Sequence, residues 1–404
     1  MNAGNNVFAK FKAQKAMIQN VDRFFTPSKP IEAYTHLKGR DAEVEHILST
    51  LTTAGQHCMI YGERGIGKSS LALSTLEGGK QAGLFNQPFF IKRCDNKTKF
   101  KDIIQEPVIY LDEDYAANKK ETTRKTGIGL NLLKLFRADV AIEEKLIIEK
   151  EDLTASKVSH AFNDIEGILL IDEFDVVEDA VKHEVAELIK QLSDSNSKLK
   201  ILLVGIASDG ASLIAGHQSV NRCLHEIKLS RIEDQYLYEI ILIGEQGLGL
   251  TFEKAIKDKI VEISNGFPYF THLIGKEAAE VALAEGKNPI GKEVLDRALE
   301  KAVINTEGQL KRAYDDAVTS SRTTVYPSIL YAAAKFSDNR FTIQDWIAQI
   351  KNDTGVQYSN NGMSNYIGRF TRADKGSIIT KAARGVYKIS DPRMPSYIKM
   401  INNH

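Results

Sequence analysis

Residues 62–69 read Gly-Glu-Arg-Gly-Ile-Gly-Lys-Ser and match the phosphate-binding pattern G-x-x-x-x-G-K-[ST] at every fixed position. The short apolar run 57–61 precedes this loop, and residues 70–76 follow it with apolar side chains at helical spacing. A strand, a glycine-rich loop and a helix in this order form an anion site, because backbone N–H groups and the helix N-terminus face the phosphates. The stretch therefore predicts an α/β fold built around a bound nucleotide.

Each residue of this loop has an expected role. Lys68 is expected to reach the β- and γ-phosphates of ATP and to serve turnover, and Ser69 is expected to hold Mg²⁺. A glycine-rich turn that matches by chance is the alternative, and it leaves the flanking strand and helix unexplained. The residues expected to contact the nucleotide from this loop are Gly62, Glu63, Arg64, Gly65, Ile66, Gly67, Lys68, Ser69 and Ser70.

A second apolar run, residues 167–171, ends in two carboxylates and is typical of a central parallel strand buried on both faces. Asp172 has the position of a Walker B aspartate and is expected to hold Mg²⁺ through water, because this ion prefers oxygen ligands. Glu173 is expected to polarise the attacking water as a general base. The simpler alternative is a buried strand that ends in solvated acids.

Two further polar residues are candidates for the reaction. The apolar run 199–207 predicts a strand beside the Walker B strand, and Ser208 at its end is a candidate to touch the γ-phosphate; a capping serine fits equally well. Arg222 precedes residues 226–229, whose alternation predicts an outer strand of the sheet. Its guanidinium is a candidate arginine finger for a neighbouring subunit, with a surface ion pair as the alternative.

Arg231 is a weaker second candidate for the finger, and Ser230 with Glu233 fits a capping box that opens the next helix. From there to about residue 319 the apolar spacing is helical throughout.

The 404-residue chain has the composition of a globular protein, with 43% hydrophobic and 26% charged residues. Its three cysteines, Cys58, Cys94 and Cys223, are far apart and predict reduced core thiols in a cytoplasmic protein. No apolar run approaches the length of a membrane span, and the N-terminal stretch lacks the apolar region of a signal peptide. We therefore expect a cytoplasmic protein without a membrane partner.

Charge is distributed unevenly along the chain. Residues 320–404 hold 12 Lys and Arg against 5 Asp and Glu, a net charge of +7, and the remainder carries −7 because the whole chain is neutral. A basic C-terminal module on an acidic body suggests a polyanionic partner. Ordinary scatter of charge is the alternative.

The same C-terminal stretch predicts a first helix at 325–336 and a third at 359–370. A capping box at Thr342 and Asp345 opens the second helix, which contains Trp346 and Ile350. Residues 377–380 and 385–389 then predict a hairpin. Three helices followed by a basic hairpin resemble a winged helix–turn–helix, whose third helix enters the major groove of DNA while the wing contacts its backbone. A winged helix used for protein contacts is the alternative.

The residues of this module have two expected roles on double-stranded DNA. Asn360, Asn361, Ser364 and Asn365 are expected to reach base edges. The residues expected to face phosphates are Arg369, Arg372, Lys375, Lys381, Arg384 and Lys388.

Taken in order, these motifs resemble the AAA+ ATPases, in particular the origin-recognition and initiator-like branch. Pro30-Ile31 and the stretch 37–41 resemble the segment that packs around the adenine in that branch, which implies nucleotide contacts from Pro30, Ile31, Gly39 and Arg40. Residues 264–270 resemble the Gly-x-Pro element of the signalling ATPases called STAND proteins, which implies a nucleotide contact from Pro268.

The resemblance implies three domains. Residues 1–230 would form a P-loop AAA+ core, a parallel sheet flanked by helices, followed by a helical lid at 231–319 and a winged helix–turn–helix domain at 320–404. Lys68 and Asp172 are 104 residues apart, and we expect a strand at 88–92 and an insertion at about 112–150 within this interval. The insertion is expected to be a hairpin or helix at the upper edge of the sheet.

The chain departs from the family pattern in two places. Ser208 stands where many AAA+ proteins carry an asparagine, and Gly266-Phe267-Pro268 stands where many carry a lid arginine. Both departures are compatible with slow hydrolysis of ATP, for which Mg²⁺ is the expected cofactor. The main hypothesis is an ATPase switch that self-assembles with ATP and binds DNA. The alternative is a STAND-like signalling ATPase that recruits a protein effector, in phage defence or transposition.

Overall fold

The computed structural model describes residues 17–31, 33–85, 88–118, 154–163, 165–207, 209–215, 220–306, 308–320 and 324–402. The chain divides into two compact units. The core unit comprises Ile31–Glu63 and Lys68–Ser230, and the lid–tail unit comprises Met1–Pro30, Arg64–Gly67 and Arg231–His404. The expected lid and the expected C-terminal module therefore fall in one unit.

A five-stranded parallel sheet forms the centre of the core unit, in the order β2-β3-β4-β1-β5. The strand expected beside the Walker B strand does pair with it, and the strand expected at the outside lies at the sheet edge. Because parallel strands end at one edge, the phosphate loop and the end of β3 meet there. The strands are β1 (His57–Gly62), β2 (Phe89–Arg93), β3 (Gly167–Asp172), β4 (Leu199–Ile206) and β5 (Leu224–Leu229).

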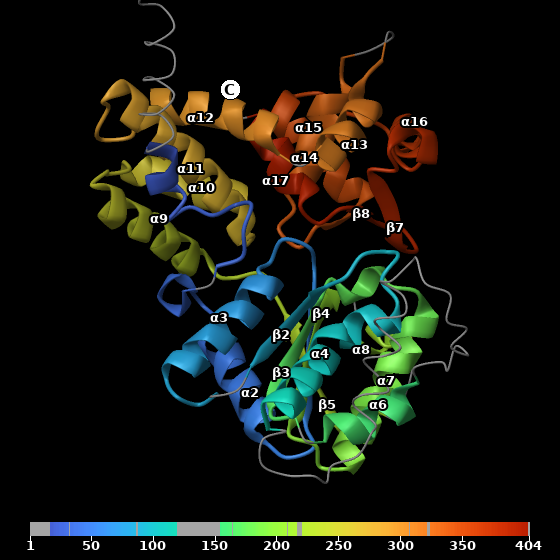
Figure 1. Ribbon diagram of the computed structural model, residues 1–404. Coiled ribbons are helices and arrows are strands. Elements are labelled where there is room, and N and C mark those ends of the chain that lie inside the picture. Colours follow the sequence, from blue (N-terminus) through green and yellow to red (C-terminus); the bar gives the residue numbers. More distant parts are fainter. Residues whose placement is uncertain are drawn as a thin grey trace, which may run out of the picture. The chain divides into compact units, whose positions relative to one another are not determined.

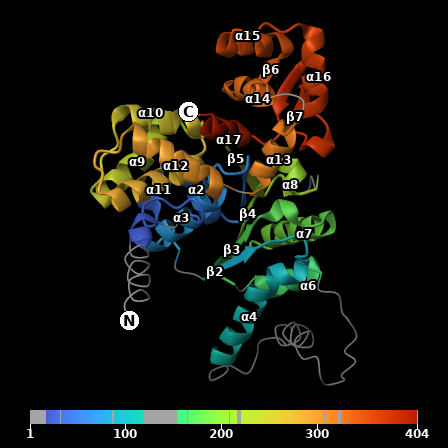
Figure 2. The same cartoon turned by 90° about the horizontal axis from the view of Figure 1, so that it is seen from above.

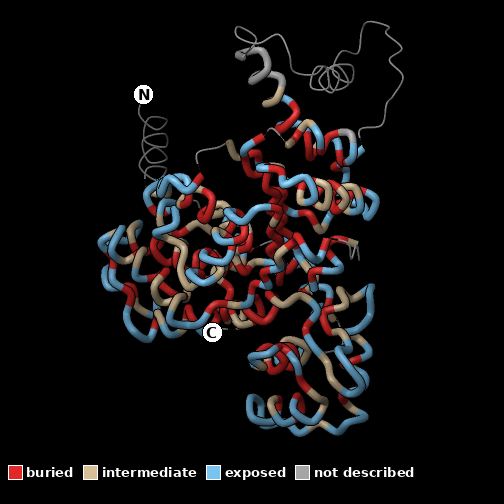
Figure 3. Tube along the Cα trace, turned by 90° about the horizontal axis from the view of Figure 1, so that it is seen from below, coloured by how far each residue is buried: buried red, intermediate tan, exposed pale blue. Residues whose placement is uncertain are grey.

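Helices cover both faces of this sheet, with α2 and α3 on one side and α4, α6 and α7 on the other (Figure 1). Every residue of β1 and β3 is buried, and Figure 3 shows this buried centre in red. Burial on both faces explains why these strands are continuous apolar runs in sequence. The core helices are η1 (Tyr34–His36), α2 (Asp41–Thr52), α3 (Lys68–Gln81), α4 (Phe100–Asn118), α6 (Ala155–Phe162), η2 (Phe174–Val176), α7 (Asp179–Asp194) and α8 (Gly210–Leu213).

The segment expected to be an insertion is described only in part. Helix α4 continues to Asn118, so the first residues of the interval 112–150 extend a helix that starts at Phe100 and packs against β2 and α7. Residues 119–150, and the expected hairpin or helix with them, lie outside the described residues.

The lid part of the second unit is built of helices, as its apolar spacing predicts, with one isolated parallel β-bridge between Phe252 and Ile290 in its described residues. Helices α9 to α12 pack on one another (Figure 2). The expected capping box at Ser230 and Glu233 is wrong, because Glu233 is itself the N-cap and its side chain makes no capping hydrogen bond. The helices are α9 (Asp234–Leu248), α10 (Lys254–Ser264), α11 (Pro268–Glu285), α12 (Lys292–Asn305) and α13 (Gly308–Val318). None of the helices in the described part of the chain is long and apolar enough to cross a bilayer.

The C-terminal module contains the three expected helices and the expected hairpin, together with a third strand. Its sheet is antiparallel in the order β6-β8-β7. The capping box of Thr342 and Asp345 is confirmed, and Ser359 caps α16. The elements are α14 (Tyr326–Ala334), β6 (Arg340–Thr342), α15 (Ile343–Thr354), α16 (Asn360–Phe370), η4 (Ala373–Lys375), β7 (Ile379–Ala383), β8 (Val386–Ile389) and α17 (Met394–Ile401).

Helix α17 joins this module to the lid. It packs against α14 of the module and against α10 and α12 of the lid. The Ser396 hydroxyl donates to the carbonyl oxygen of Ser264 at 3.3 Å, and Lys399 Nζ donates to that of Glu262 at 3.3 Å. Six residues of this short helix are buried, so the joint is apolar as well as polar. This explains why lid and module form one compact unit.

The N-terminal segment is anchored on the lid by Phe25, which is fully buried. Its ring lies over two glycines: a Cβ added at Gly244 would meet a ring atom at 2.1 Å, and one added at Gly275 would meet another at 2.5 Å. The rings of Phe252 and His272 contact it edge-on, at centroid distances of 6.5 and 6.3 Å. The two glycines therefore form a slot that accepts an aromatic ring.

We expect Phe25→Ala to lower the free energy of unfolding of the lid–tail unit by about 3–5 kcal/mol, because it leaves a buried aromatic site empty. Trp346 is the only tryptophan of the chain and is fully buried in the same unit, so its fluorescence during urea unfolding measures the effect. Phe24→Ala is the matched control and should cost clearly less, since Phe24 is only partly buried. Equal stability of Phe25→Ala and the wild type would rule out this anchor.

Candidate nucleotide-binding site

The phosphate loop joins the end of β1 to the start of α3. Three of its glycines adopt positive φ angles, 150° at Gly62, 81° at Gly65 and 92° at Gly67, which other residues rarely adopt. Lys68 is 8% exposed, and its Nζ donates to the carbonyl oxygens of Gly62 at 3.1 Å and Glu63 at 2.7 Å. The ammonium group is therefore held on the inside of the loop, as expected for a group that contacts phosphates.

A hydrogen bond connects the two predicted metal-binding residues. Ser69 Oγ, in the first turn of α3, donates to Oδ1 of Asp172 at 2.9 Å. Asp172 ends β3 and is 4% exposed, and its Oδ1 also accepts from the backbone N–H of Glu173 at 2.9 Å. A serine hydroxyl beside an aspartate carboxylate is a donor set that suits Mg²⁺ bound together with nucleotide phosphates. The residues present therefore fit the ion that the phosphate loop implies.

The turn after β3 presents Glu173 to solvent. Its backbone adopts a left-handed conformation, with φ 57° and ψ 36°, which is uncommon for glutamate, and the residue is exposed. Its role as general base stays a prediction. Asp175 in the same turn accepts a hydrogen bond from the backbone N–H of Ile206 at 2.8 Å and so ties this turn to the end of β4. Sequence reasoning assigned Asp175 no role.

The candidate Ser208 lies outside the described residues, two positions beyond Ile206. Its contact with the γ-phosphate stays a prediction.

The segment before the phosphate loop lies against α3. The backbone N–H of Ile31 donates to Ser70 Oγ at 3.0 Å, and Ser74 Oγ donates to the carbonyl oxygen of Ile31 at 2.6 Å. These bonds place residues 30 and 31 beside the helix that carries Lys68 and Ser69. Contacts of Pro30, Ile31 and Gly39 with the nucleotide stay predictions.

Arg40 has a structural partner at the end of the core unit. Its Nη2 donates to the carbonyl oxygen of Ser230 at 2.6 Å, and its Nη1 contacts Glu43 at 2.9 Å. The side chain is 6% exposed, and this burial lowers the pKa of the guanidinium. These contacts give Arg40 a structural role at the last residue of the core unit, and its contact with nucleotide stays a prediction.

Arg222 lies at the amino-terminal edge of the sheet, opposite to the phosphate loop. Leu224 pairs with His57, the first residue of β1, while Gly62 is the last. A strand of six residues spans about 20 Å, which is farther than an arginine side chain can reach. Arg222 therefore does not serve its own phosphate loop, and its role on a neighbouring subunit stays a prediction.

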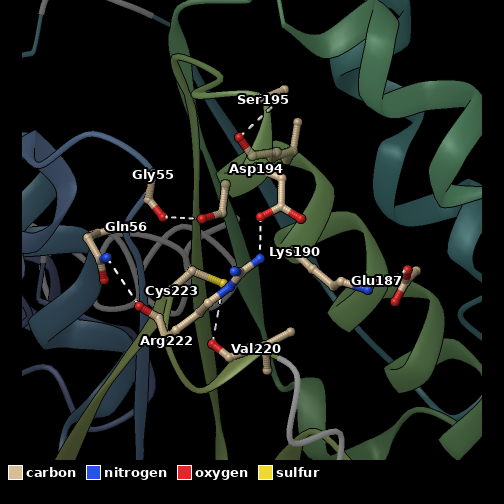
Figure 4. A network of polar contacts seen from close by, with 11 residues as sticks. Gly55, Gln56, Glu187, Lys190, Asp194, Ser195, Val220, Arg222 and Cys223 are labelled. Carbon is tan, nitrogen blue, oxygen red and sulfur yellow. Dashed lines mark hydrogen bonds and ion pairs between the residues drawn. The ribbon is translucent and has the colours of Figure 1, made fainter.

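The surroundings of Arg222 are polar and open (Figure 4). Its side chain is 64% exposed, and the guanidinium pairs with Asp194 at the end of α7. Gln56 Nε2 donates to the carbonyl oxygen of Arg222 at 3.3 Å. The predicted alternative, a surface ion pair, is thus present in the structure, and it does not exclude a role toward another subunit.

The Gly-Phe-Pro element packs on the first residues of the lid. The guanidinium of Arg231 lies 4.5 Å from the centroid of the Phe267 ring, and Arg231 Nη1 donates to the carbonyl oxygen of Ser337 at 3.3 Å. Pro268 occupies the first turn of α11, where a missing backbone N–H costs nothing. The Arg231 side chain therefore contacts Phe267 and Ser337 of its own unit. Contact of Pro268 with nucleotide stays a prediction.

The exposed face of α16 carries the four residues expected at base edges. Asn360, Asn361, Ser364 and Asn365 are all exposed. Lys381, Arg384 and Lys388 are exposed on the β7–β8 hairpin. These side chains are accessible to a ligand, and their contact with DNA stays a prediction.

Two of the cations expected to face phosphates have protein partners instead. Arg369 Nε donates to the carbonyl oxygen of Ala317 at 2.8 Å and its Nη2 to that of Thr319 at 2.6 Å, while the guanidinium lies 4.4 Å from the Tyr326 ring centroid. Arg369 thus caps the C-terminal end of α13, a place that favours cations. Arg372 makes a bidentate pair with Asp374 at 2.9 and 2.7 Å. Both guanidinium groups therefore have protein partners in this structure, and their contact with DNA phosphates stays a prediction.

The three cysteines are buried and unpaired, as predicted. Burial raises the pKa of Cys58 to about 12, and burial is also the main cause that raises the pKa of Cys94 to about 12. Neither thiol is therefore a ready nucleophile near neutral pH.

Comparison with known proteins gives a family and a fold. The structure is similar to the Walker-type ATPase PABY2304 of Pyrococcus abyssi, with a TM-score of 0.51 and 17% identity over 92% of this chain and 99% of that chain. It is similar to the Aeropyrum pernix ORC2 protein, with a TM-score of 0.51 and 15% identity over 94% of this chain and 96% of that chain. At these identities the likeness shows the fold alone, and the parallel sheet with its flanking helices fits the P-loop AAA+ α/β fold.

Sequence comparison is more specific. No curated protein matches the chain. The family model described as Novel STAND NTPase 1 matches residues 32–278, which is more than half of the chain and includes the phosphate loop and Asp172. The chain therefore belongs to the Novel STAND NTPase 1 family.

Proposed function

We propose that this protein is an ATP-hydrolysing switch that assembles with further copies of itself when ATP is bound and binds double-stranded DNA through its C-terminal module. The hydrogen bond between Ser69 Oγ and Asp172 Oδ1 carries the proposal. It brings the phosphate loop and the Walker B strand together at one sheet edge, with a hydroxyl and a carboxylate suited to Mg²⁺. The family, one of NTPases, supports the hydrolytic part.

The residues of the site have distinct tasks in this reaction. Lys68 neutralises the β- and γ-phosphates, and Ser69 and Asp172 would hold Mg²⁺, which supplies further neutralisation of phosphate charge. Glu173 accepts a proton from the attacking water, whose oxygen bonds to the γ-phosphorus while the bond to the β–γ bridging oxygen breaks. ADP and inorganic phosphate are the products.

Arg222 is our candidate for the contact between copies. Its position opposite its own phosphate loop is compatible with action only on a neighbour's nucleotide. An exposed ion pair such as that with Asp194 is worth at most about 1 kcal/mol, so a γ-phosphate can compete for the guanidinium. In this proposal, ATP joins the copies and hydrolysis releases them.

We infer that the C-terminal module is a winged helix–turn–helix. The order of helix, strand, two helices and hairpin supports this reading, as do the exposed polar side chains on α16. Arg369 and Arg372 pair with protein groups in this structure, so a DNA phosphate would have to displace those partners. Lys381, Arg384 and Lys388 on the hairpin are the proposed phosphate contacts.

The family match favours a second candidate function. As a member of a STAND family, the protein would recruit a protein effector through the same exposed faces of the module, in phage defence or transposition. The Arg369 and Arg372 partnerships leave fewer free cations for DNA than the sequence suggests. Duplex binding separates the two candidates.

We expect Lys68→Ala to abolish binding of a fluorescent ATP analogue, because the phosphates lose their cation. Glu173→Gln should bind the analogue normally but release phosphate about 10²–10⁴-fold more slowly, since the general base is lost. Glu166→Gln is the matched control, because Glu166 precedes the same strand at its other end and pairs with Lys198. Equal rates of phosphate release in Glu173→Gln and the wild type would refute the assigned base.

We expect the triple variant Lys381→Gln, Arg384→Gln and Lys388→Gln to weaken duplex binding in the presence of ATP, measured by fluorescence anisotropy. The slope of log affinity against log salt should fall by about 2–3, because up to three phosphate contacts are lost.

The control removes three exposed charges from helices of the lid, by Lys254→Gln, Lys292→Gln and Lys311→Gln. It should bind DNA like the wild type. If the wild type does not bind duplex DNA at low salt with ATP present, the DNA-binding proposal is refuted and the effector-recruiting one is favoured.

A further inference from the structure

Arg93 lies directly opposite Asp172 in the sheet. It is the last residue of β2, and the parallel register pairs it with Asp172 at the end of β3. The backbone N–H of Cys94 donates to the carbonyl oxygen of Asp172 at 2.9 Å, so the pairing continues past Arg93. The edge strand thus fixes the Arg93 backbone beside the candidate metal-binding carboxylate.

The two oxygens of Asp172 have different surroundings. Oδ1 accepts the hydrogen bonds from Ser69 and Glu173 already described. Oδ2 faces Arg93, whose Nε lies 3.8 Å away. The Arg93 side chain is 58% exposed while that of Asp172 is 6% exposed, so a buried carboxylate meets a solvent-facing cation.

The end of these two strands carries several carboxylates. Burial is the largest cause of the raised pKa of Cys94. The negative charges of Asp172, Asp95 and Glu173 raise this pKa further, while the positive charge of Lys92 lowers it. Negative charge at this point favours a nearby cation. A guanidinium remains charged at every relevant pH, and its fork matches phosphate oxygens as well as carboxylates.

We propose that Arg93 is a further phosphate-contacting residue of the ATP hydrolysis site and that it shares Asp172 with the nucleotide-bound Mg²⁺. Without nucleotide, its guanidinium pairs with Oδ2. With ATP bound, Asp172 would hold Mg²⁺, and the Arg93 guanidinium would pair with the oxygens of the γ-phosphate. The exchange is easy because the Arg93 side chain is 58% exposed and lies 3.8 Å from Oδ2, so solvent screens the pair and leaves it worth about 1 kcal/mol. This inference rests on the proposed ATP site and on neither DNA binding nor assembly.

The test compares Arg93→Gln and Arg93→Lys with the matched control Lys92→Gln, which removes a charge one residue earlier, on the other face of β2. The readouts are the Mg²⁺ concentration that half-saturates binding of a fluorescent ATP analogue, and kcat for phosphate release. Arg93→Gln should lower the half-saturating Mg²⁺ concentration by up to about fivefold, because a competing cation worth 1 kcal/mol is lost. It should also lower kcat.

Arg93→Lys should keep the half-saturating Mg²⁺ concentration of the wild type, since a cation remains, but lower kcat because lysine lacks the fork. In the Asp172→Asn background, Arg93→Gln should no longer shift the Mg²⁺ dependence, as expected for residues that act through one contact. Lys92→Gln should match the wild type in both readouts.

An unchanged Mg²⁺ dependence in Arg93→Gln, or the same shift in Lys92→Gln, would overturn the inference. A wild type that fails to bind the analogue at any Mg²⁺ concentration would overturn the nucleotide site itself, and the role of Arg93 with it. If the wild type binds and hydrolyses ATP while Arg93→Gln leaves both readouts unchanged, the nucleotide site stands and only the role of Arg93 is refuted.

Discussion

The hydrogen bond between Ser69 and Asp172 joins residues 103 positions apart in the chain and defines the chemistry of the core unit. It requires β1 and β3 to run in parallel with only β4 between them, so that a helix starting after β1 reaches the end of β3. It also requires the glycine turn of the phosphate loop, which directs α3 back over the sheet. The burial of both strands, the exposed Glu173 and the adjacent Arg93 all follow from this arrangement.

A second constraint operates in the lid–tail unit. Helix α17 binds lid and C-terminal module into one body, and Phe25 anchors the N-terminal segment in the same unit. In the core unit, Ile31 is bonded to Ser70 and Ser74 of the helix that follows the phosphate loop. Only residues 26–30 separate the two anchors, so the chain connects the nucleotide helix to the lid through a short segment. This segment is one of four covalent links between the units, and the others lie at residues 63–64, 67–68 and 230–231.

Most of the fold could be predicted because its signals are local. The continuous apolar runs ending in Asp172 and Ile206 identify buried parallel strands, and the alternation before Leu229 identifies an edge strand. Glycine and serine residues at capping positions, such as Ser359, identify the ends of helices. The capping box at Ser230 and Glu233 is a local error, whereas most of the contacts that the sequence could not specify involve partners distant in sequence. Arg40, Arg222 and Arg369 are alike in sequence, yet they pair with groups 190, 28 and 52 residues away. Arg93 was missed because its importance depends on the register of β2 against β3, and α17 because it is short and has no repeated pattern.

The central claim is that ATP, held between the phosphate loop and Asp172, controls assembly of the protein. Sedimentation velocity of the wild type with Mg²⁺ and either ATP or ADP tests it most directly. We expect a larger species with ATP that reverts to the ADP species as the nucleotide is hydrolysed. Identical sedimentation coefficients with ATP, with ADP and without nucleotide, under conditions where ATP is bound, would contradict it.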